Sequence, residues 1–180
     1  HRYPLGFSGD THMTWESLDF QPYFTNCATN IGYVWWSHDI GGHCCGYKDN
    51  ELYIRWLQYG VFSPINRLHS TNNVFSGKEP WKLCDWAKPI AEEWLRKRHE
   101  FFPYIYTMNY RNHIELEPLV QPMYYEHPKL SAAYDMKNQY MFGTELMVAP
   151  ITTPNNNITQ MGSVDVWFPK GDWFDFFKGT

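Results

Sequence analysis

Three short apolar runs near the start of the chain each end in a polar side chain that can do chemistry. They are residues 3–9, which end at Asp10, residues 33–38, which end at Asp39, and residues 61–68, which end at His69. These ends are spaced 29 and 30 residues apart. A strand, a helix and their loops take about this length, because parallel strands need a crossover between them. The pattern therefore predicts three parallel strands joined by helices.

The segments between these runs begin with residues that favour helix starts. Thr14 is a predicted N-cap for a helix that begins at Trp15. Asp49 is a predicted N-cap for a second helix over residues 51–59, in which apolar side chains recur at helical spacing. Strand and helix units whose strand ends carry Asp, Asp and His predict the α/β class and the later part of a (β/α)₈ TIM barrel, where such ends form the active site. A doubly wound parallel sheet is the alternative.

A polar loop and a long helix are expected next. The loop covers residues 70–80, and the helix covers about residues 86–110. Pro103 lies inside this helix and predicts a kink or a break, because proline lacks the N–H that the helix needs. The basic run at residues 96–99 is interpreted as a solvated helix face.

From about residue 118 the pattern changes to short strands with turns between them. The predicted strands are residues 119–125, 145–151, 164–169 and 173–177. Because no helical segment separates the last of them, they predict the beginning of an antiparallel β-sandwich. The sequence thus predicts two domains, with the barrel part at residues 1–117 and the start of the β-sandwich at residues 118–180.

Charge and hydropathy exclude two classes of partner. The net charge is −4, and the 15 Lys and Arg residues are scattered along the chain, so we expect no nucleic-acid partner. No stretch approaches the roughly 18 consecutive apolar residues of a membrane span, so no membrane partner is expected. The 4 cysteines include no CxxC pair, which favours reduced thiols and a cytoplasmic protein.

Aromatic content is high, at 19% of residues with 9 Trp. Aromatic rings stack on the apolar faces of sugars while their polar edges hydrogen-bond, so the composition is compatible with carbohydrate binding. An aromatic core or interface explains the same composition equally well, and composition alone does not decide between them.

Asp10 is the first candidate for chemistry. It follows Gly9, which allows a tight turn from strand to loop, and Phe7 is an apolar neighbour. A carboxyl in this setting can act as a general acid in catalysis. Because it also precedes a helical segment, helix capping is the simpler explanation when Asp10 is considered alone.

Asp39 is the second candidate, in the segment WWSHDIGGH. Its carboxylate can accept hydrogen bonds from adjacent sugar hydroxyls while a nearby indole stacks on the ring. Metal binding by His38, Asp39 and His43 is a competing interpretation, which the absence of an HExxH-type ligand spacing weakens. His69 at the third end is unremarkable alone, but the equal spacing of the three ends favours a shared site.

These motifs resemble glycoside hydrolase family 31, the family of α-glucosidases and α-xylosidases. The resemblance covers GFSGDTHMTW, NIGYVWWSHDIGGH and QYGVFSPINRLHS in the predicted barrel part. It continues through RHEFFPYIYTMNY, PLVQPMYYEHP, FGTELMVAPI and VWFPKGDWFDFFKGT, and so includes essentially the whole chain. The resemblance implies a retaining α-glycoside hydrolase that removes terminal α-linked glucose or related sugars from oligosaccharides and needs no cofactor.

The resemblance also implies roles for individual residues. Asp10 corresponds to the catalytic general acid/base, Asp39 to the aspartate that holds the glycone, and His69 to a sugar-binding histidine. Further substrate-binding positions are Phe7, Trp35, Trp36 and Arg67. Where many mammalian members carry an aromatic residue shortly after the glycone-binding aspartate, this chain has His43, so the aglycone side of the pocket is expected to differ.

One departure from the family is central to the expectation for activity. The family nucleophile lies in a W-x-D-M-N-E type motif on an earlier strand, and the 180 residues contain no such motif. We therefore expect a fragment that is inactive alone and that associates with the missing part of the barrel or with copies of itself. A carbohydrate-binding module without catalysis is the alternative function.

Overall fold

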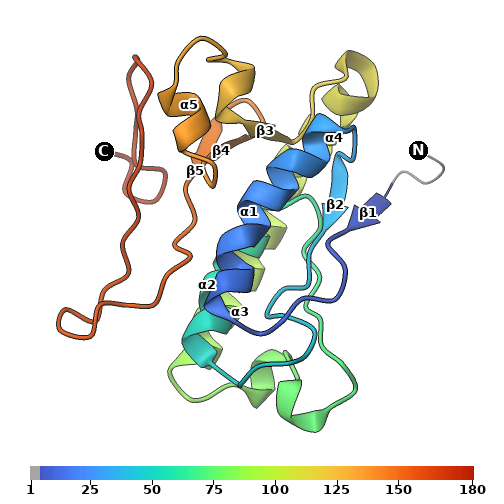
Figure 1. The fold of residues 1–180 in the computed structure, drawn as a ribbon, viewed down its shortest axis with the longest axis vertical. Helices are drawn as coiled ribbons and strands as arrows, with labels where there is room; N and C mark the ends of the chain where they lie inside the picture. Colours follow the sequence, from blue (N-terminus) through green and yellow to red (C-terminus); the bar gives the residue numbers. More distant parts are fainter. Residues whose placement is uncertain (1–4) are drawn as a thin grey trace.

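The computed structural model describes residues 5–180 (Figure 1). Residues 3 and 4 of the first predicted strand lie outside the described residues. Strand β1 (Leu5–Phe7) and strand β2 (Trp35–Ser37) pair in parallel, with Leu5 opposite Trp35, and helix α1 (Trp15–Asn30) connects them. The predicted parallel unit with a helical crossover is therefore confirmed for the first two strands. The described residues do not form a closed barrel.

Helix α1 begins where the sequence predicts. The Thr14 hydroxyl accepts a hydrogen bond from the backbone N–H of Ser17 at 3.2 Å, so Thr14 rather than Asp10 is the N-cap. The buried face of α1 is largely polar, because Gln21, Thr25 and Thr29 lie on it. Their side chains donate hydrogen bonds to backbone carbonyls one turn earlier, which compensates for the loss of water.

Helix α2 (Asn50–Val61) forms the centre of the main hydrophobic core. Leu52, Trp56 and Tyr59 recur on one face and are almost completely buried, in agreement with the predicted spacing. The Asp49 carboxylate caps the helix by accepting from the backbone N–H groups of Glu51 at 2.8 Å and Leu52 at 3.2 Å.

The Asp49 cap gives a stability prediction. Asp49→Ala is expected to lower the free energy of unfolding by about 1–2 kcal/mol, because the first N–H groups of α2 lose their acceptor. Asp49→Asn is the matched control, since an amide oxygen can still accept from them. Urea unfolding followed by circular dichroism measures both variants. Equal losses in the two variants would contradict the assignment of the effect to the cap acceptor.

The third predicted strand, residues 61–68, is wrong as a strand. Helix α2 continues through Val61, and the segment makes a single parallel bridge, between Ile40 and Leu68. The Arg98 guanidinium donates to the carbonyl oxygens of Val61, Ser63 and Pro64 at 2.6, 2.7 and 2.9 Å. These carbonyls are therefore bound in a turn and are not available to a strand partner.

The predicted long helix is two helices, α3 (Ala87–Glu100) and α4 (Phe102–Glu115), with a break at Phe101. Pro103 occupies the first turn of α4, where proline is tolerated, so the predicted break is confirmed. The interpretation of the basic run as a solvated face is wrong for Arg98. Its side chain turns inward, and burial lowers its pKa to about 10. Short 3₁₀ helices η1 (Val74–Ser76) and η2 (Pro80–Lys82) lie in the preceding loop.

The later part of the chain contains a small antiparallel sheet of order β3-β4-β5. Its strands are Val120–Pro122, Tyr140–Phe142 and Leu146–Val148, and the short helices η3 (Met123–Tyr125) and α5 (Ala132–Asp135) lie between the first two strands. The first and third strands lie within the predicted strands at residues 119–125 and 145–151 but are shorter than predicted. The central strand is not predicted by the sequence. This sheet packs on α1, and the chain beyond it runs along the side of the molecule that lies opposite β1 and β2 (Figure 1).

The predicted strands at residues 164–169 and 173–177 are wrong, since no strand forms there within the described part of the chain. The Gln139 side chain accepts from the Trp167 N–H at 3.0 Å and donates to the Trp167 carbonyl at 2.8 Å, and so takes the place of a strand partner. The Asp175 carboxylate accepts from the N–H groups of Phe177 and Lys178 and holds a turn. The described residues therefore contain a three-stranded sheet but no β-sandwich. No helix of residues 5–180 is long and apolar enough to cross a membrane.

Candidate active site

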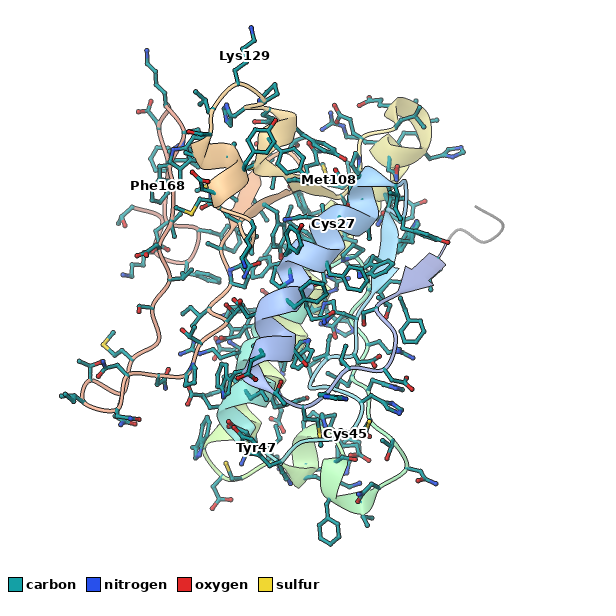
Figure 2. All side chains as sticks on the ribbon, viewed as in Figure 1. Cys27, Cys45, Tyr47, Met108, Lys129 and Phe168 are labelled. Atoms are coloured by element: carbon teal, nitrogen blue, oxygen red, sulfur yellow. The ribbon has the colours of Figure 1, made fainter. Side chains whose placement is uncertain are left out.

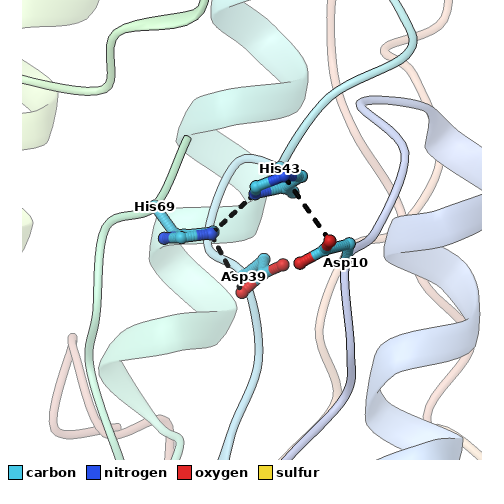
Figure 3. A group of neighbouring side chains, drawn as sticks. All are labelled: Asp10, Asp39, His43 and His69. Carbon is cyan, nitrogen blue, oxygen red and sulfur yellow. Dashed lines mark hydrogen bonds and ion pairs between the residues drawn. The ribbon is translucent and has the colours of Figure 1, made fainter. Parts of the chain in front are cut away.

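Four side chains from three loops meet beyond the carboxyl ends of the parallel strands (Figure 3). Asp10 follows β1, Asp39 and His43 follow β2, and His69 follows the bridge at Leu68. One ligand atom from each residue can be chosen so that all four lie within 4.8 Å of one another. The structure thus brings together the three predicted strand ends, and it adds His43.

Asp39 is the buried centre of this site, with no side-chain surface exposed to solvent. Its Oδ1 accepts from the Arg67 guanidinium at 2.8 Å and lies 3.9 Å from Nε2 of His69. Its Oδ2 accepts a hydrogen bond from the backbone N–H of Thr11 at 3.4 Å, and Thr11 lies in the loop that carries Asp10. A buried carboxylate needs such partners, and here they come from both neighbouring loops.

His43 and His69 connect the two carboxylates. Nδ1 of His43 and Nε2 of His69 are 2.7 Å apart, and Nε2 of His43 lies 3.6 Å from Asp10. The ring centroids are 4.9 Å apart and the ring planes nearly parallel, so the rings meet edge to edge rather than face to face. The pKa of His69 is lowered by burial, against the attraction of Asp39, so this ring is neutral near neutral pH.

The chain after Asp39 turns sharply through two glycines. Gly41 and Gly42 have φ of +88° and +80°, a region that glycine enters without steric cost. A Cβ on Gly42 would lie 2.8 Å from the Cα of Met13, so this loop packs directly on the one that follows Asp10. The Gly-Gly pair of the sequence is thus required to place His43 beside Asp10.

His38 lies beneath Asp39 and is completely buried. Its Nδ1 accepts from the Trp56 indole at 3.1 Å, so its Nε2 carries the proton and donates to the Ser63 hydroxyl at 2.8 Å. Ser63 in turn donates to the Tyr59 carbonyl at 3.0 Å. Both ring nitrogens of His38 are used, so the competing interpretation of His38, Asp39 and His43 as metal ligands is wrong for His38.

The buried His38 ring predicts a pH dependence of stability. Burial, with the charges of Arg67 and Arg98, lowers the pKa of His38 to about 3, against an ordinary value of 6.5. Below pH 6.5 the unfolded state binds a proton that the folded state excludes. Stability is therefore complete above pH 6.5 and falls as the pH decreases towards 3, by up to about 1.4 kcal/mol per pH unit.

Urea unfolding at pH 7 and pH 5 measures this slope. His38→Gln should unfold with a smaller difference between the two pH values, because the titrating ring is gone. His99→Gln, at an exposed histidine of α3, is the matched control and should keep the native slope. A native slope in His38→Gln would contradict the assignment.

Asp10, Asp39, His43 and His69 also have the residue types of a metal site. One candidate ligand atom is already bound by a cationic side chain, because the Arg67 guanidinium binds Oδ1 of Asp39, the oxygen that lies nearest His69. Asp10, whose side chain is 65% exposed, stands on the open side of the cluster. This arrangement fits a polar ligand with several hydroxyl groups better than a closed metal centre.

The predicted aromatic positions divide into two groups. Phe7 is half-exposed at the end of β1, and the Arg67 guanidinium lies over its ring at 5.6 Å, so Phe7 borders the site. Trp36 points the other way, because its ring packs against Phe24 and Tyr33 on the α1 side. Its placement thus disagrees with a role in the pocket wall. Trp35 is the preceding residue of β2, so its side chain points to the opposite face from Trp36, and it is 37% exposed.

Two family models match the chain. The glycosyl hydrolases family 31 TIM-barrel domain matches residues 1–108, and the family 31 C-terminal domain matches residues 116–180. Among curated relatives, alpha-glucosidase 2 of Bacillus thermoamyloliquefaciens is 29% identical over 179 residues, which are 99% of this chain and 22% of that protein. Alpha-xylosidases are also among these relatives. The chain thus spans about a fifth of the length of the curated proteins that it matches.

Solved structures give the same result. A family 31 dextranase of Flavobacterium johnsoniae, complexed with isomaltotriose, is 32% identical with a TM-score of 0.85. The match covers 99% of this chain and 22% of the dextranase. The cycloalternan-degrading enzyme of Trueperella pyogenes, in complex with a covalent intermediate, is 25% identical with a TM-score of 0.89 over 98% of this chain and 25% of that one.

Proposed function

The chain belongs to glycosyl hydrolase family 31, and we propose that it is the later part of a retaining α-glycoside hydrolase of the α-glucosidase type. The substrate would be a terminal α-linked glucose or related sugar on an oligosaccharide. The observation that carries this proposal is the meeting of exposed Asp10 with the buried Asp39–Arg67 pair and His69 at one edge of the parallel strands.

Asp10 is the proposed general acid/base. Its side chain is 65% exposed, so a glycosidic oxygen can approach it, and a nitrogen of His43 lies 3.6 Å away. In the first step it would protonate the departing oxygen, and in the second it would take a proton from the water that releases the sugar.

Asp39, Arg67 and His69 are the proposed glycone-binding group. Asp39 fixes Arg67 at 2.8 Å, and 45% of the Arg67 side chain remains exposed to reach a hydroxyl. Because Asp39 is fully buried, a sugar hydroxyl can reach its carboxylate only when a neighbouring side chain moves. His43 and His69, which contact each other beside Asp39, are such neighbours. Contacts of this kind strengthen as the sugar ring flattens towards the oxocarbenium-like transition state.

The nucleophile is proposed to lie outside these 180 residues. Retaining enzymes hold two carboxyl groups about 5 Å apart, and carboxylate oxygens of Asp10 and Asp39 come within 4.8 Å. The separation therefore fits, but Asp39 is fully buried and its Oδ1 is bound by Arg67, so it is not free to attack an anomeric carbon. We propose that the rest of the barrel supplies the attacking carboxylate, and that the chain is inactive without it.

The anomeric form of the first product tests the retaining reaction. Proton NMR of the full-length protein acting on an α-glucoside should show the α-anomer of the sugar first, since two displacements restore the configuration. A first product in the β form would reject the proposal. The covalent intermediate in the similar enzyme of Trueperella pyogenes is the species that the retaining route requires.

A carbohydrate-binding module without catalysis is the second candidate function. The contact between His43 and His69 and the covered Asp39 suit a tight polar binding site as well as a catalytic one. Sugar binding by a full-length protein that shows no hydrolysis over long incubation would favour this alternative.

A further inference from the structure

Cys44 and Cys45 form a pair of neighbouring thiols on the loop that begins at Asp39. Their sulfur atoms are 3.0 Å apart, and Cys45 is exposed while Cys44 is half-buried. Cys27 and Cys84 are single, half-buried thiols. Figure 2 shows Cys45 near Tyr47 at one end of the molecule and Cys27 on α1, well away from it.

We propose that Cys44 and Cys45 are an oxidation site, at which a peroxide closes the two thiols into a disulfide that disturbs the neighbouring active-site loop. The formation of the bond depends on the thiol pair alone. Its effect on catalysis rests on the function proposed above.

The backbone holds the two thiols together. Cys45 has a φ of +52°, in the left-handed region that residues other than glycine seldom enter, so the surrounding structure imposes this conformation. The Cys44 N–H donates to the Thr11 carbonyl at 3.3 Å, and the Cys44 carbonyl accepts from the Met13 N–H at 3.0 Å. A Cβ on Gly46 would lie 2.4 Å from the Met13 carbonyl oxygen, so the loop is packed closely on both sides of the pair.

Exposure and charge distinguish the roles of the two sulfurs. The hydrogen bond to Cys45, together with burial and the negative charges of Asp10 and Asp39, raises the pKa of the Cys44 thiol. The Cys44 thiol is therefore harder to ionise than an ordinary cysteine. The exposed Cys45 is the sulfur that an oxidant in solution reaches first.

The chemistry needs hydrogen peroxide as the oxidant. The Cys45 thiol gives up its proton and the sulfur attacks one peroxide oxygen, so an S–O bond forms and the O–O bond breaks. The hydroxide that leaves takes up that proton and becomes water. The Cys44 sulfur then attacks the Cys45 sulfenic acid, so the S–S bond forms and the S–O bond breaks. The second hydroxide leaves with the Cys44 proton as water. Two thiols lose two electrons in total, and one peroxide becomes two waters.

Such a disulfide would be easily reduced. Disulfide-bonded residues ordinarily have Cα atoms about 4.4–6.8 Å apart, whereas neighbouring Cα atoms are about 3.8 Å apart. The resulting strain favours reduction, and exposed, strained disulfides are the labile ones. The pair therefore suits a reversible switch better than a permanent crosslink.

The same loop carries His43, which gives the switch a route to the active site. The His43 N–H donates to the Thr11 carbonyl at 2.8 Å, and its ring contacts both His69 and Asp10. Ring closure at Cys44 and Cys45 changes the backbone directly after His43. We expect His43 to shift and Asp10 to lose its neighbour.

Peptide mass spectrometry tests the modification on the 180-residue chain. After brief peroxide treatment and alkylation, the peptide with Cys44 and Cys45 should be unalkylated and lighter by two hydrogens, and dithiothreitol should reverse both changes. Cys44→Ser should stop at the Cys45 sulfenic acid, which dimedone labels. The Cys27→Ser/Cys84→Ser double variant is the matched control and should still form the bond. Alkylation of Cys44 and Cys45 to the same extent as Cys27, or a disulfide between two chains, would overturn the proposal.

Activity of the full-length protein tests the effect on the site. Oxidation should lower kcat/KM by up to about a hundredfold, as expected for a small displacement of catalytic groups, and reduction should restore it. Unchanged kcat/KM after proven disulfide formation would overturn the coupling to the site. A reduced protein with no glycosidase activity would instead reject the proposed function, while the mass measurement would still decide the oxidation site.

Discussion

Replacing Asp10 by Asn in the full-length enzyme is expected to lower kcat on a disaccharide by about two to four orders of magnitude. The amide has the size of the carboxyl but can neither protonate the leaving oxygen nor deprotonate the attacking water. Folding should change little, within about 0.5 kcal/mol, because the side chain is mostly exposed and its polar neighbour, His43, is 3.6 Å away. Initial rates and urea unfolding of the same preparation measure both effects.

The leaving group separates an acid role from a general structural one. An aryl α-glucoside with an acidic phenol needs little protonation, so the first chemical step of Asp10→Asn should be much less impaired on it than on a disaccharide. Glu16→Gln removes an exposed carboxylate at the start of α1 and should turn over at the native rate. Near-native turnover of a disaccharide by Asp10→Asn would remove Asp10 from this role.

Asp39→Asn is expected to weaken the binding of a glucose-shaped iminosugar by about tenfold to a hundredfold, which corresponds to the loss of one charge-assisted hydrogen bond. The buried carboxylate holds Arg67 at 2.8 Å and lies 3.9 Å from His69, so its neutral replacement releases both partners. Calorimetric titration of the full-length protein measures the affinity.

Two comparisons make the Asp39 result specific. Asp85→Asn makes the same chemical change at an exposed aspartate before α3 and should bind the inhibitor with native affinity. Arg67→Lys keeps the positive charge but loses the planar guanidinium, and we expect an intermediate affinity. If Asp39→Asn folds normally and binds like the native protein, Asp39 does not belong to the glycone site.

Local hydrogen bonding explains which parts of the fold the sequence could predict. Thr14 and Asp49 accept hydrogen bonds from backbone N–H groups within three residues, so their capping role can be predicted from the adjacent sequence alone. The parallel pairing of β1 and β2 follows from two apolar runs at the spacing of a helical crossover. These elements need no knowledge of distant partners.

The wrong predictions fail for the opposite reason. Residues 61–68 look like a strand, but Arg98 binds three of their carbonyl oxygens from more than 30 positions away. Residues 164–169 also look like a strand, yet the Gln139 side chain satisfies both backbone groups of Trp167. A single polar side chain from a distant segment replaces a strand neighbour in both cases, and no local pattern reveals it.

The site shows the same division. Asp10, Asp39 and His69 could be located from the spacing of the apolar runs that precede them, and the structure brings them together. The direct contact between His43 and His69 could not, because it depends on the turn at Gly41 and Gly42. The motif with a histidine directly after two glycines was the available signal, and it pointed to His43 as an unusual position without giving its partner.

The inward guanidinium of Arg98 also sets an order for synthesis on the ribosome. The turn that it holds is translated about 34 residues earlier, so its carbonyl groups are made before their donor. Until α3 emerges, those groups can bind only water. Arg67 and His69 follow that turn directly, so the nascent chain cannot complete this half of the pocket during their own translation. A translational pause before Arg98 is made would therefore prolong a state in which this turn lacks its donor.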